Sequence, residues 1–276
     1  MKNIFTVLVF ALISSVSNAQ SGNLDSTFGT NGKVVGFGFG ECFASAIQQD
    51  GKIIAAGRSD LNGGRDNFLI VRYLSNGELD SSFGSNGKVV TGFVDANKGD
   101  YDYEAVYSIS IQSDGRIIVA GDGYIGYPDV NYNILLARYT KDGRLDSSFG
   151  INGKVSHDFG GNEYASSMIM QPDGKLIVTG EMGNSILVAR YMSDGNLDES
   201  FGNNGIVISN FGGIGISRSV ALQSDGKIVI AGGTNVGSGE KFLVVRYLSD
   251  GNLDVTFGVG GSVITDFGKN DEQLNK

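Results

Sequence analysis

One six-residue phrase returns five times along the chain, and this repetition constrains the fold more than any other feature of the sequence. Its first copy reads Leu-Asp-Ser-Thr-Phe-Gly, and its aspartates are Asp25, Asp80, Asp146, Asp198 and Asp254. Successive copies lie roughly 52–66 residues apart. A period of this length is typical of a supersecondary unit of about four strands and exceeds that of helical-pair repeats.

Each unit contains four apolar, strand-like runs. In the first unit they are residues 33–37, 44–48, 52–57 and 68–73, and an Asp-Gly pair joins the second run to the third in every complete unit. Asp-Gly between two such runs predicts a tight hairpin of type I′, in which both central residues have positive φ. The third and fourth runs are apolar on both faces, which favours strands that lie between two layers.

These features predict an all-β protein, a β-propeller built from four roughly 52–66-residue four-stranded repeats plus one extra C-terminal strand. We expect the first run of each unit to be innermost and the fourth run to be outermost. The predicted ring closes with four blades or by association of chains. The predicted boundaries are residues 20–268 for the propeller, with repeats at 24–78, 79–144, 145–196, 197–252 and a partial one at 253–268, and residues 269–276 for a polar tail.

Three motifs recur in fixed order: L-D-x-x-F-G-x-N-G-K-V, Q-x-D-G-K-I and V-R-Y. Together they resemble the bacterial delta-60 repeat family, a β-propeller of unknown function found in exported and cell-surface proteins. The resemblance covers about residues 22 to 268 and departs modestly at Ile206 and at Gly260-Gly261-Ser262. It implies a propeller outside the cytoplasm and brings no catalytic residues with it.

Residues 1–19 read as a secretory signal. Lys2 precedes a short apolar stretch, and Ser17-Asn18-Ala19 supplies the small residues of a cleavage site. The predicted location is therefore the periplasm, the cell surface or the surrounding medium. No other segment is apolar enough for an integral membrane span, and a net charge of −9 argues against nucleic acid as a partner. Cys42 is the only cysteine, so an internal disulfide is excluded.

Catalytic motifs are missing from the sequence. His157 is the only histidine, and no G-x-S-x-G elbow occurs. The glycine clusters are followed by strands, whereas a phosphate-binding loop opens a helix. We therefore predict that the chain is not an enzyme and has no cofactor. A hydrolase or lyase that works with carboxylates alone stays open as an alternative, because two carboxylates suffice for acid chemistry.

One arginine and one phrase aspartate recur in each unit. A charge in a packed position needs a partner, so we expect structural ion pairs between them, with a ring of binding residues as the alternative. The residues are Arg72, Arg138, Arg190 and Arg246, and Asp25, Asp80, Asp146 and Asp198.

The second unit has the longest variable loops, residues 94–104 and 122–133. Six of the 11 tyrosines lie in or beside these loops, together with several carboxylates. Aromatic faces beside carboxylates bind sugars or cationic groups, and clustered carboxylates are also possible ligands for Ca²⁺. We predict a protein- or polysaccharide-binding module of the cell envelope or extracellular space, with a structural envelope module as an alternative. The predicted ligand-binding residues are Tyr101, Tyr103, Tyr124, Tyr127, Asp100, Asp102 and Asp122.

Overall fold

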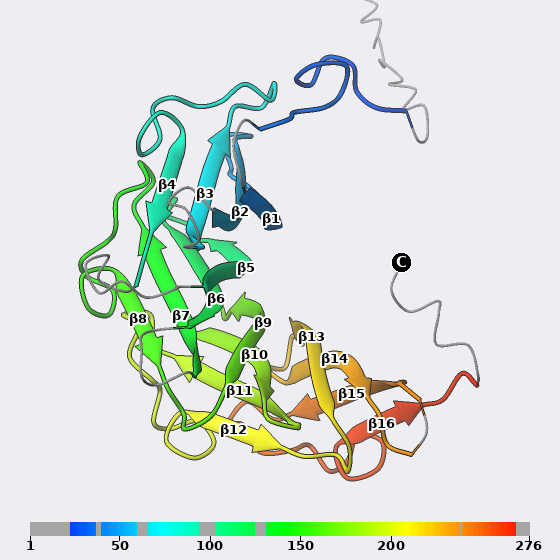
Figure 1. Cartoon of the computed structure of the whole chain (residues 1–276). Helices are drawn as coiled ribbons and strands as arrows, with labels where there is room; N and C mark the ends of the chain where they lie inside the picture. The colour runs from blue at the N-terminus through cyan, green and yellow to red at the C-terminus, as the bar shows by residue number, and fades with distance from the viewer. Residues whose placement is uncertain are drawn as a thin grey trace, which may run out of the picture.

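The computed structural model describes residues 23–36, 40–59, 66–93, 103–124, 131–237 and 239–268. Within these ranges the regular structure consists of strands only, and they form four antiparallel four-stranded sheets (Figure 1). The prediction of an all-β chain with four four-stranded blades is confirmed. The predicted signal and the polar tail lie outside the described residues.

We number the sheets as blades 1 to 4 in chain order. Blade 1 contains β1 (Gly40–Ile47), β2 (Ile53–Ser59), β3 (Asn67–Tyr73) and β4 (Lys88–Thr91). Blade 2 contains β5 (Tyr103–Ile111), β6 (Ile117–Tyr124), β7 (Tyr132–Tyr139) and β8 (Lys154–His157). Blade 3 contains β9 (Glu163–Met170), β10 (Leu176–Met182), β11 (Ser185–Tyr191) and β12 (Ile206–Ser209). Blade 4 contains β13 (Gly215–Leu222), β14 (Ile228–Thr234), β15 (Lys241–Tyr247) and β16 (Ser262–Thr265).

The strand order within a blade differs from the expected one. The first strands β1, β5, β9 and β13 contact one another along the inside, and the short fourth strand is outermost (Figure 1). That fourth strand comes from the phrase that follows the blade, so the prediction that the first run of each unit is innermost and the fourth run outermost was wrong. The reason is local. Asp80 N–H donates to the carbonyl of Arg72, so the phrase folds back along the strand that it has just left instead of crossing to the centre.

The predicted extra C-terminal strand is present as β16, and it completes blade 4 by pairing with β15. The equivalent run of the first phrase has no sheet to join: within residues 33–36, Lys33 alone makes bridges, to Gly29 and Thr30. Five phrases therefore serve four blades. The first phrase is the supernumerary copy.

The Asp-Gly turns are not of type I′. Gln48 N–H donates to Lys52 O at 2.8 Å, and Gly51 N–H donates to Gln48 O at 2.9 Å. Only the glycine has positive φ, 82° at Gly51. This is a three-residue loop in which a type I turn is followed by a glycine bulge, so one left-handed residue suffices where type I′ needs two. The pattern recurs at each of the other three Asp-Gly turns.

The hydrophobic core lies between the blades. Each cluster combines the back face of one blade with the front face of the next, where the front face is the one turned toward the preceding blade. The phrase phenylalanines Phe83, Phe149 and Phe201 fill these junctions and are fully buried. Burial on both faces explains why the third and fourth runs are apolar throughout.

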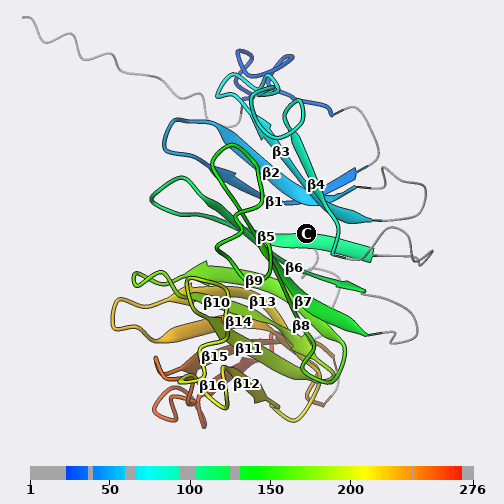
Figure 2. The ribbon, with the colours of Figure 1, turned by 90° about the vertical axis from the view of Figure 1, so that its left-hand side faces the viewer.

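The four blades follow an arc that is open on one side (Figure 1) and stack one on the next when viewed from the side (Figure 2). In the described ranges, β16 pairs with β15 and no strand pair joins blade 4 to blade 1. The same ranges contain no helix that is long and apolar enough to cross a membrane.

Candidate functional site

The two ends of each blade differ in regularity. One end carries the Asp-Gly turns and the crossovers that contain the phrase, and we call it the crossover end. The opposite end carries the loops before the first strand and between the second and third strands, and we call it the loop end. Among the described residues, the predicted ligand-binding residues Tyr103, Asp122 and Tyr124 belong to the loop end, and each recurring Arg and Asp belongs to the crossover end.

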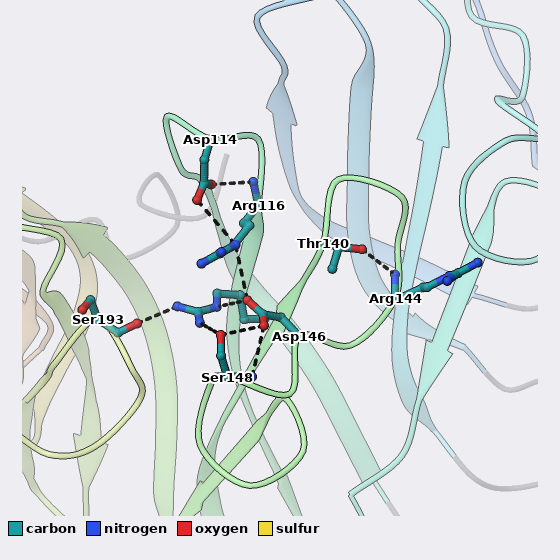
Figure 3. Close-up of polar contacts among 8 residues, drawn as sticks. Asp114, Arg116, Thr140, Arg144, Asp146, Ser148 and Ser193 are labelled. Carbon is teal, nitrogen blue, oxygen red and sulfur yellow. Dashed lines mark hydrogen bonds and ion pairs between the residues drawn. The ribbon is translucent and has the colours of Figure 1, made fainter.

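At the crossover end blades 1 to 3 repeat one set of bonds, and blade 4 keeps the ion pair of this set. In blade 2, Arg138 Nε donates to Asp146 Oδ2 at 2.8 Å, and its Nη1 donates to the carbonyl of Ser193 in the next blade at 2.6 Å. The Ser148 hydroxyl donates to the second oxygen of Asp146 at 2.7 Å (Figure 3). The Arg138 guanidinium also lies 4.8 Å from the centre of the Phe149 ring. The arginine therefore ties a phrase, its phenylalanine and the neighbouring blade together.

The same arrangement joins Arg72 to Asp80, Arg190 to Asp198 and Arg246 to Asp254, at 2.7 to 2.8 Å. Burial opposes ionisation of Asp80, but the Ser82 side-chain and backbone bonds, with Lys52 and Arg72, lower its pKa to about 2. Asp25, the remaining phrase aspartate, accepts bonds from the Thr27 side chain and backbone and pairs with no arginine in the described residues. In the described residues no blade precedes it to supply one.

At the loop end every inner strand has a β-bulge, and the bulged residues are Phe43, Tyr107, Ser166 and Arg218. A glycine of the neighbouring strand faces each bulge. A Cβ on Gly121 would lie 1.8 Å from the carbonyl oxygen of Ala105, so only glycine fits there. Bulges commonly re-aim side chains beside functional sites. Here four different side chains occupy one repeated position.

A tyrosine cluster occupies the loop end of blades 2 and 3. The ring centre of Tyr132 lies 6.0 Å from that of Tyr103, 6.2 Å from Tyr124 and 4.9 Å from Tyr164. Strand pairing sets Tyr103 opposite Tyr124 and Tyr124 opposite Tyr132, so three rings come from adjacent positions of blade 2. Tyr164 is 42 % exposed. The cluster thus has an aromatic ring available to a ligand.

Blade 1 contributes charge and a further ring to the edge of this cluster. The Arg58 guanidinium lies 4.8 Å from the centre of the Tyr103 ring and is paired with Glu41 and Asp66, each at 2.8 Å. Phe43 packs on Tyr107 at 5.3 Å between ring centres, and the Tyr107 and Tyr103 hydroxyl oxygens are 3.3 Å apart. Burial raises the pKa of Tyr107, so this hydroxyl stays protonated at neutral pH.

Two carboxylates lie on strands next to the tyrosines: Asp122 precedes Tyr124 by two residues in β6, and Glu181 of β10 is paired with Tyr164. Asp122 is buried, and its Oδ2 accepts the N–H of Ala165 from blade 3 at 2.9 Å. Burial, opposed by this bond and assisted by the charge of Glu181, raises the pKa of Asp122 to about 7. Burial also raises the pKa of Glu181, although Arg218 and the N–H of Ser217 act in the opposite direction. Asp122 and Glu181 follow the bulge-facing glycines of blades 2 and 3, so they occupy equivalent positions.

Of the predicted ligand-binding residues, the structure brings Tyr103, Tyr124 and Asp122 together at this end. Tyr101, Tyr127, Asp100 and Asp102 lie outside the described residues. Sequence reasoning missed Tyr164, Arg58 and Glu181. The signal for the last two was present, because each follows the recurrent glycine at the end of the third run.

No group of three or more His, Cys, Asp or Glu side chains within the described ranges is placed to hold a metal ion. The loop carboxylates considered for Ca²⁺ lie partly outside these ranges. His157 is half-buried, and its ring stacks on Phe159 at 5.7 Å. Burial lowers its pKa, so the ring is neutral at pH 7.

Comparison with solved structures finds the propeller fold in enzymes. A putative gluconolactonase shares 15% identity, with a TM-score of 0.36, and the match covers 76% of this chain and 60% of that one. The aldose sugar dehydrogenase of Streptomyces coelicolor shares 13% identity, with a TM-score of 0.48 and coverage of 84% and 68%. The GH43 endo-arabinanase of Bacillus licheniformis shares 12% identity, with a TM-score of 0.46 and coverage of 81% and 79%.

These similarities correct one prediction. The expectation that the chain is not an enzyme is contradicted, because the similar solved structures include enzymes. Missing sequence motifs therefore do not exclude catalysis. At these identities the similarity concerns the fold alone.

A family model places the chain more specifically. The model described as a domain of unknown function (DUF5122) β-propeller matches residues 48–83, 112–149, 171–201 and 223–257, once in each blade. These segments together make up just over half of the chain. A search of curated proteins found no match. Four matches in register with four blades show that the chain belongs to the DUF5122 β-propeller family.

Proposed function

We propose that the chain binds a glycan of the cell envelope or the extracellular space at the tyrosine cluster. The observation that carries this proposal is the contact of Tyr103, Tyr124 and Tyr164 with the central ring of Tyr132. A sugar presents a C–H face that packs on an aromatic ring and hydroxyl groups that need polar partners. The cluster offers the exposed Tyr164 ring for the first role and Arg58 with its carboxylates for the second.

Export is part of this proposal. Residues 1–19 have the sequence features of a signal peptide, and this supports export, because a glycan of the envelope or medium is accessible only to an exported protein. A negatively charged chain favours a neutral or cationic glycan over an anionic one, because like charges repel across the whole surface. A protein partner at the same cluster is the competing outcome of the experiment.

The test is a calorimetric titration of the chain from Gln20 with a panel of neutral and amino-sugar polysaccharides, which measures the affinity for each one. Tyr164→Ala is expected to weaken binding about tenfold, which corresponds to about 1.4 kcal/mol. Ile151→Ala is the matched control, because Ile151 is 80% exposed and lies in a crossover at the opposite end. If the two variants lost affinity equally, or if neither variant lost affinity, the assignment of the site to the tyrosine cluster would be overturned. Binding to a protein alone would overturn the ligand class.

A second candidate function, hydrolysis of the bound glycan, is supported by one observation. Burial and the charge of Glu181 raise the pKa of Asp122 to about 7. A carboxyl group protonated near neutral pH can donate a proton to a leaving group, and a second carboxylate can serve as nucleophile or base. The check is release of reducing ends from the bound polysaccharide. Asp122→Asn and Glu181→Gln should each abolish release and preserve affinity, and binding without any release leaves the glycan-binding proposal alone.

A further inference from the structure

The front face of blade 1 has the composition of an interior face but no blade in front of it. In blade 2 the equivalent front residues Ile117, Val119, Leu135, Ala137 and Tyr139 are all 0% exposed, because the back of blade 1 covers them. In blade 1 the equivalents are only partly covered. They are Ile53, Ala55, Leu69, Val71 and Tyr73.

The back face of blade 4 lacks a neighbour in the same way. In blade 3, Ile186 and Val188 of the back face are at most 1% exposed. Their equivalents in blade 4 are Phe242, which is 42% exposed, and Val244, which is partly exposed. The front face of blade 1 and the back face of blade 4 are thus both apolar and partly exposed. Inside the chain, a back face and a front face of this kind pack on each other at each junction between blades.

The hydrogen bonds of Arg246 differ from those of the other repeat arginines because, in the described residues, no blade follows blade 4. Arg72, Arg138 and Arg190 each donate a bond of 2.5 to 2.6 Å to a backbone carbonyl of the following blade. Among the described residues, Arg246 bonds Asp254 and has no such carbonyl, and its side chain is 20% exposed against 5% for Arg138. The repeat position of the acceptor carbonyl is that of Ser75 at the crossover end of blade 1.

We propose that the back of blade 4 of one copy packs on the front of blade 1 of a second copy. The template is the junction between blades within the chain, which unites the same residue positions. Such a contact is heterologous, and two of them related by a two-fold axis close a ring. Eight blades then complete one propeller, within the range of about four to eight that propellers adopt. In it the Arg246 guanidinium bonds the carbonyl of Ser75 of the other copy.

The first phrase, residues 23–36, occupies the place that the fifth phrase of the second copy needs. Gly29 N–H donates to Asn76 O of blade 1, as Gly84 N–H donates to Asp142 O of blade 2. The fifth phrase is held by Arg246 and by the pairing of β15 with β16. The first phrase lacks both, and Leu24 is 61% exposed. The first phrase therefore leaves when the copies associate.

The fit of the first phrase to blade 1 is loose. A cavity of about 620 Å³ remains between them, lined by Phe28 and Val34 on one side and by Cys42, Val71 and Tyr73 on the other. At the junction of blades 1 and 2 the equivalents of Phe28, Cys42, Val71 and Tyr73 are fully buried in one cluster, and Val89, the equivalent of Val34, packs against it. In the dimer, the back face of blade 4 of the second copy would fill this space, as the back face of blade 1 covers the front face of blade 2.

Cys42 reports on the contact without any substitution. It is exposed in the single chain, whereas its equivalents in the inner strands, Val106, Ala165 and Ser217, are buried. Association should protect its thiol, because a buried thiol reacts only after the copies separate. With the chain from Gln20, we expect the rate of labelling by a disulfide reagent to fall about tenfold as protein concentration increases, in parallel with a doubling of mass by sedimentation.

Two variants test the pairing of unlike faces. Val71→Asp on blade 1 and Val244→Asp on blade 4 should each be monomeric, and a mixture of the two should form a dimer through the one intact junction. Ile151→Asp, on an outward-facing crossover, should dimerise as the unchanged chain does. A monomer at all concentrations with Cys42 fully reactive would overturn the proposal. Dimers of the Val244→Asp variant by itself would also overturn the proposal. In that variant the back of blade 4 is impaired in both copies, so such a dimer would have to pair two like faces.

Discussion

The crossover end and the loop end of the blades are built from the same repeat but differ in how strictly it is kept. At the crossover end an arginine, an aspartate and a phenylalanine recur in every blade with the same contacts. At the loop end the backbone bulge is kept in every blade, whereas its side chain changes from Phe43 to Tyr107, Ser166 and Arg218.

The difference indicates that the two ends have different roles. The crossover end joins neighbouring blades, and each of its bonds must fit the next copy of the repeat, so its residues cannot vary independently. The loop end meets solvent, and its bulge presents whichever side chain the blade carries. Variable positions on a rigid frame are where binding residues are usually found. Stability should therefore depend on the crossover end, and ligand affinity on the loop end.

The largest expected effect is at the crossover end. Arg138→Met removes the cation between Asp146 and the carbonyl of Ser193, and it leaves both oxygens poorly satisfied in a buried junction. We expect a loss of about 4 kcal/mol in the free energy of unfolding, the cost of breaking a buried pair. Urea unfolding followed by circular dichroism measures it. Glycan affinity of the folded fraction should not change.

Arg246→Met is the matched comparison for this loss. Arg246 makes the same pair with Asp254 but has no following blade in the chain, and its side chain is more exposed. At protein concentrations too low for association we expect a loss of about 1 kcal/mol. Equal losses in the free energy of unfolding for the two arginine variants would show that the bond between blades contributes nothing. The claim that the crossover end stabilises the protein by joining blades would then be wrong.

A loss between those of the two arginine variants is expected from the glycine that faces a bulge. A Cβ on Gly232 would lie 1.9 Å from the carbonyl oxygen of Ile216, so Gly232→Ala must displace the inner strand of blade 4. We expect a loss of about 2 kcal/mol, as for other overpacked sites. Gly233→Ala is the control in the same strand: its nearest neighbour is 3.5 Å away, and the change should stay within about 0.5 kcal/mol. Similar results for both would mean that the bulge yields freely.

The strand count and the blade repeat could be predicted because the repeat displays them several times. The recurrence of Asp-Gly and of the apolar runs located each hairpin, and the phrase located each crossover. The order of strands within a blade could not be predicted, because it depends on one backbone bond from Asp80 to Arg72 that leaves no mark on the sequence. The turn type failed for a similar reason, since Asp-Gly suits both a type I′ turn and a type I turn with a glycine bulge.

The candidate site was predicted in part. Clustering of tyrosines in the second unit pointed to Tyr103 and Tyr124, which strand pairing does bring together. Tyr164 was missed because it belongs to the third unit and reaches the cluster only through the packing of blades. Glu181 follows the recurrent glycine of the third run, but its interaction with Arg218 and Ser217 of blade 4 depends on the packing of the blades. Contacts between blades are a property of the ring, and one sequence does not reveal them.

A further prediction separates the two ends by the sign of their pH dependence. The pKa of Asp80 is lowered to about 2, so its stabilising effect is complete above its unfolded pKa of about 3.9 and is lost as the pH falls toward 2. The pKa of Asp122 is raised to about 7, so the folded state holds a proton that the unfolded state has released above about pH 3.9. Stability should therefore decrease as the pH rises from about 4 to about 7.

Asp122→Asn isolates this contribution, because the amide oxygen can still accept the N–H of Ala165 and carries no charge. Urea unfolding of both proteins between about pH 4.5 and pH 7.5 should show the variant gaining stability relative to the unchanged chain as the pH rises. The slope becomes shallower without vanishing, because burial also raises the pKa of Glu163 and Glu181. A constant difference across this range would mean that Asp122 is ionised throughout. The loop end would then hold a stabilising carboxylate like those of the crossover end, and the contrast between the two ends would rest on side-chain variety alone.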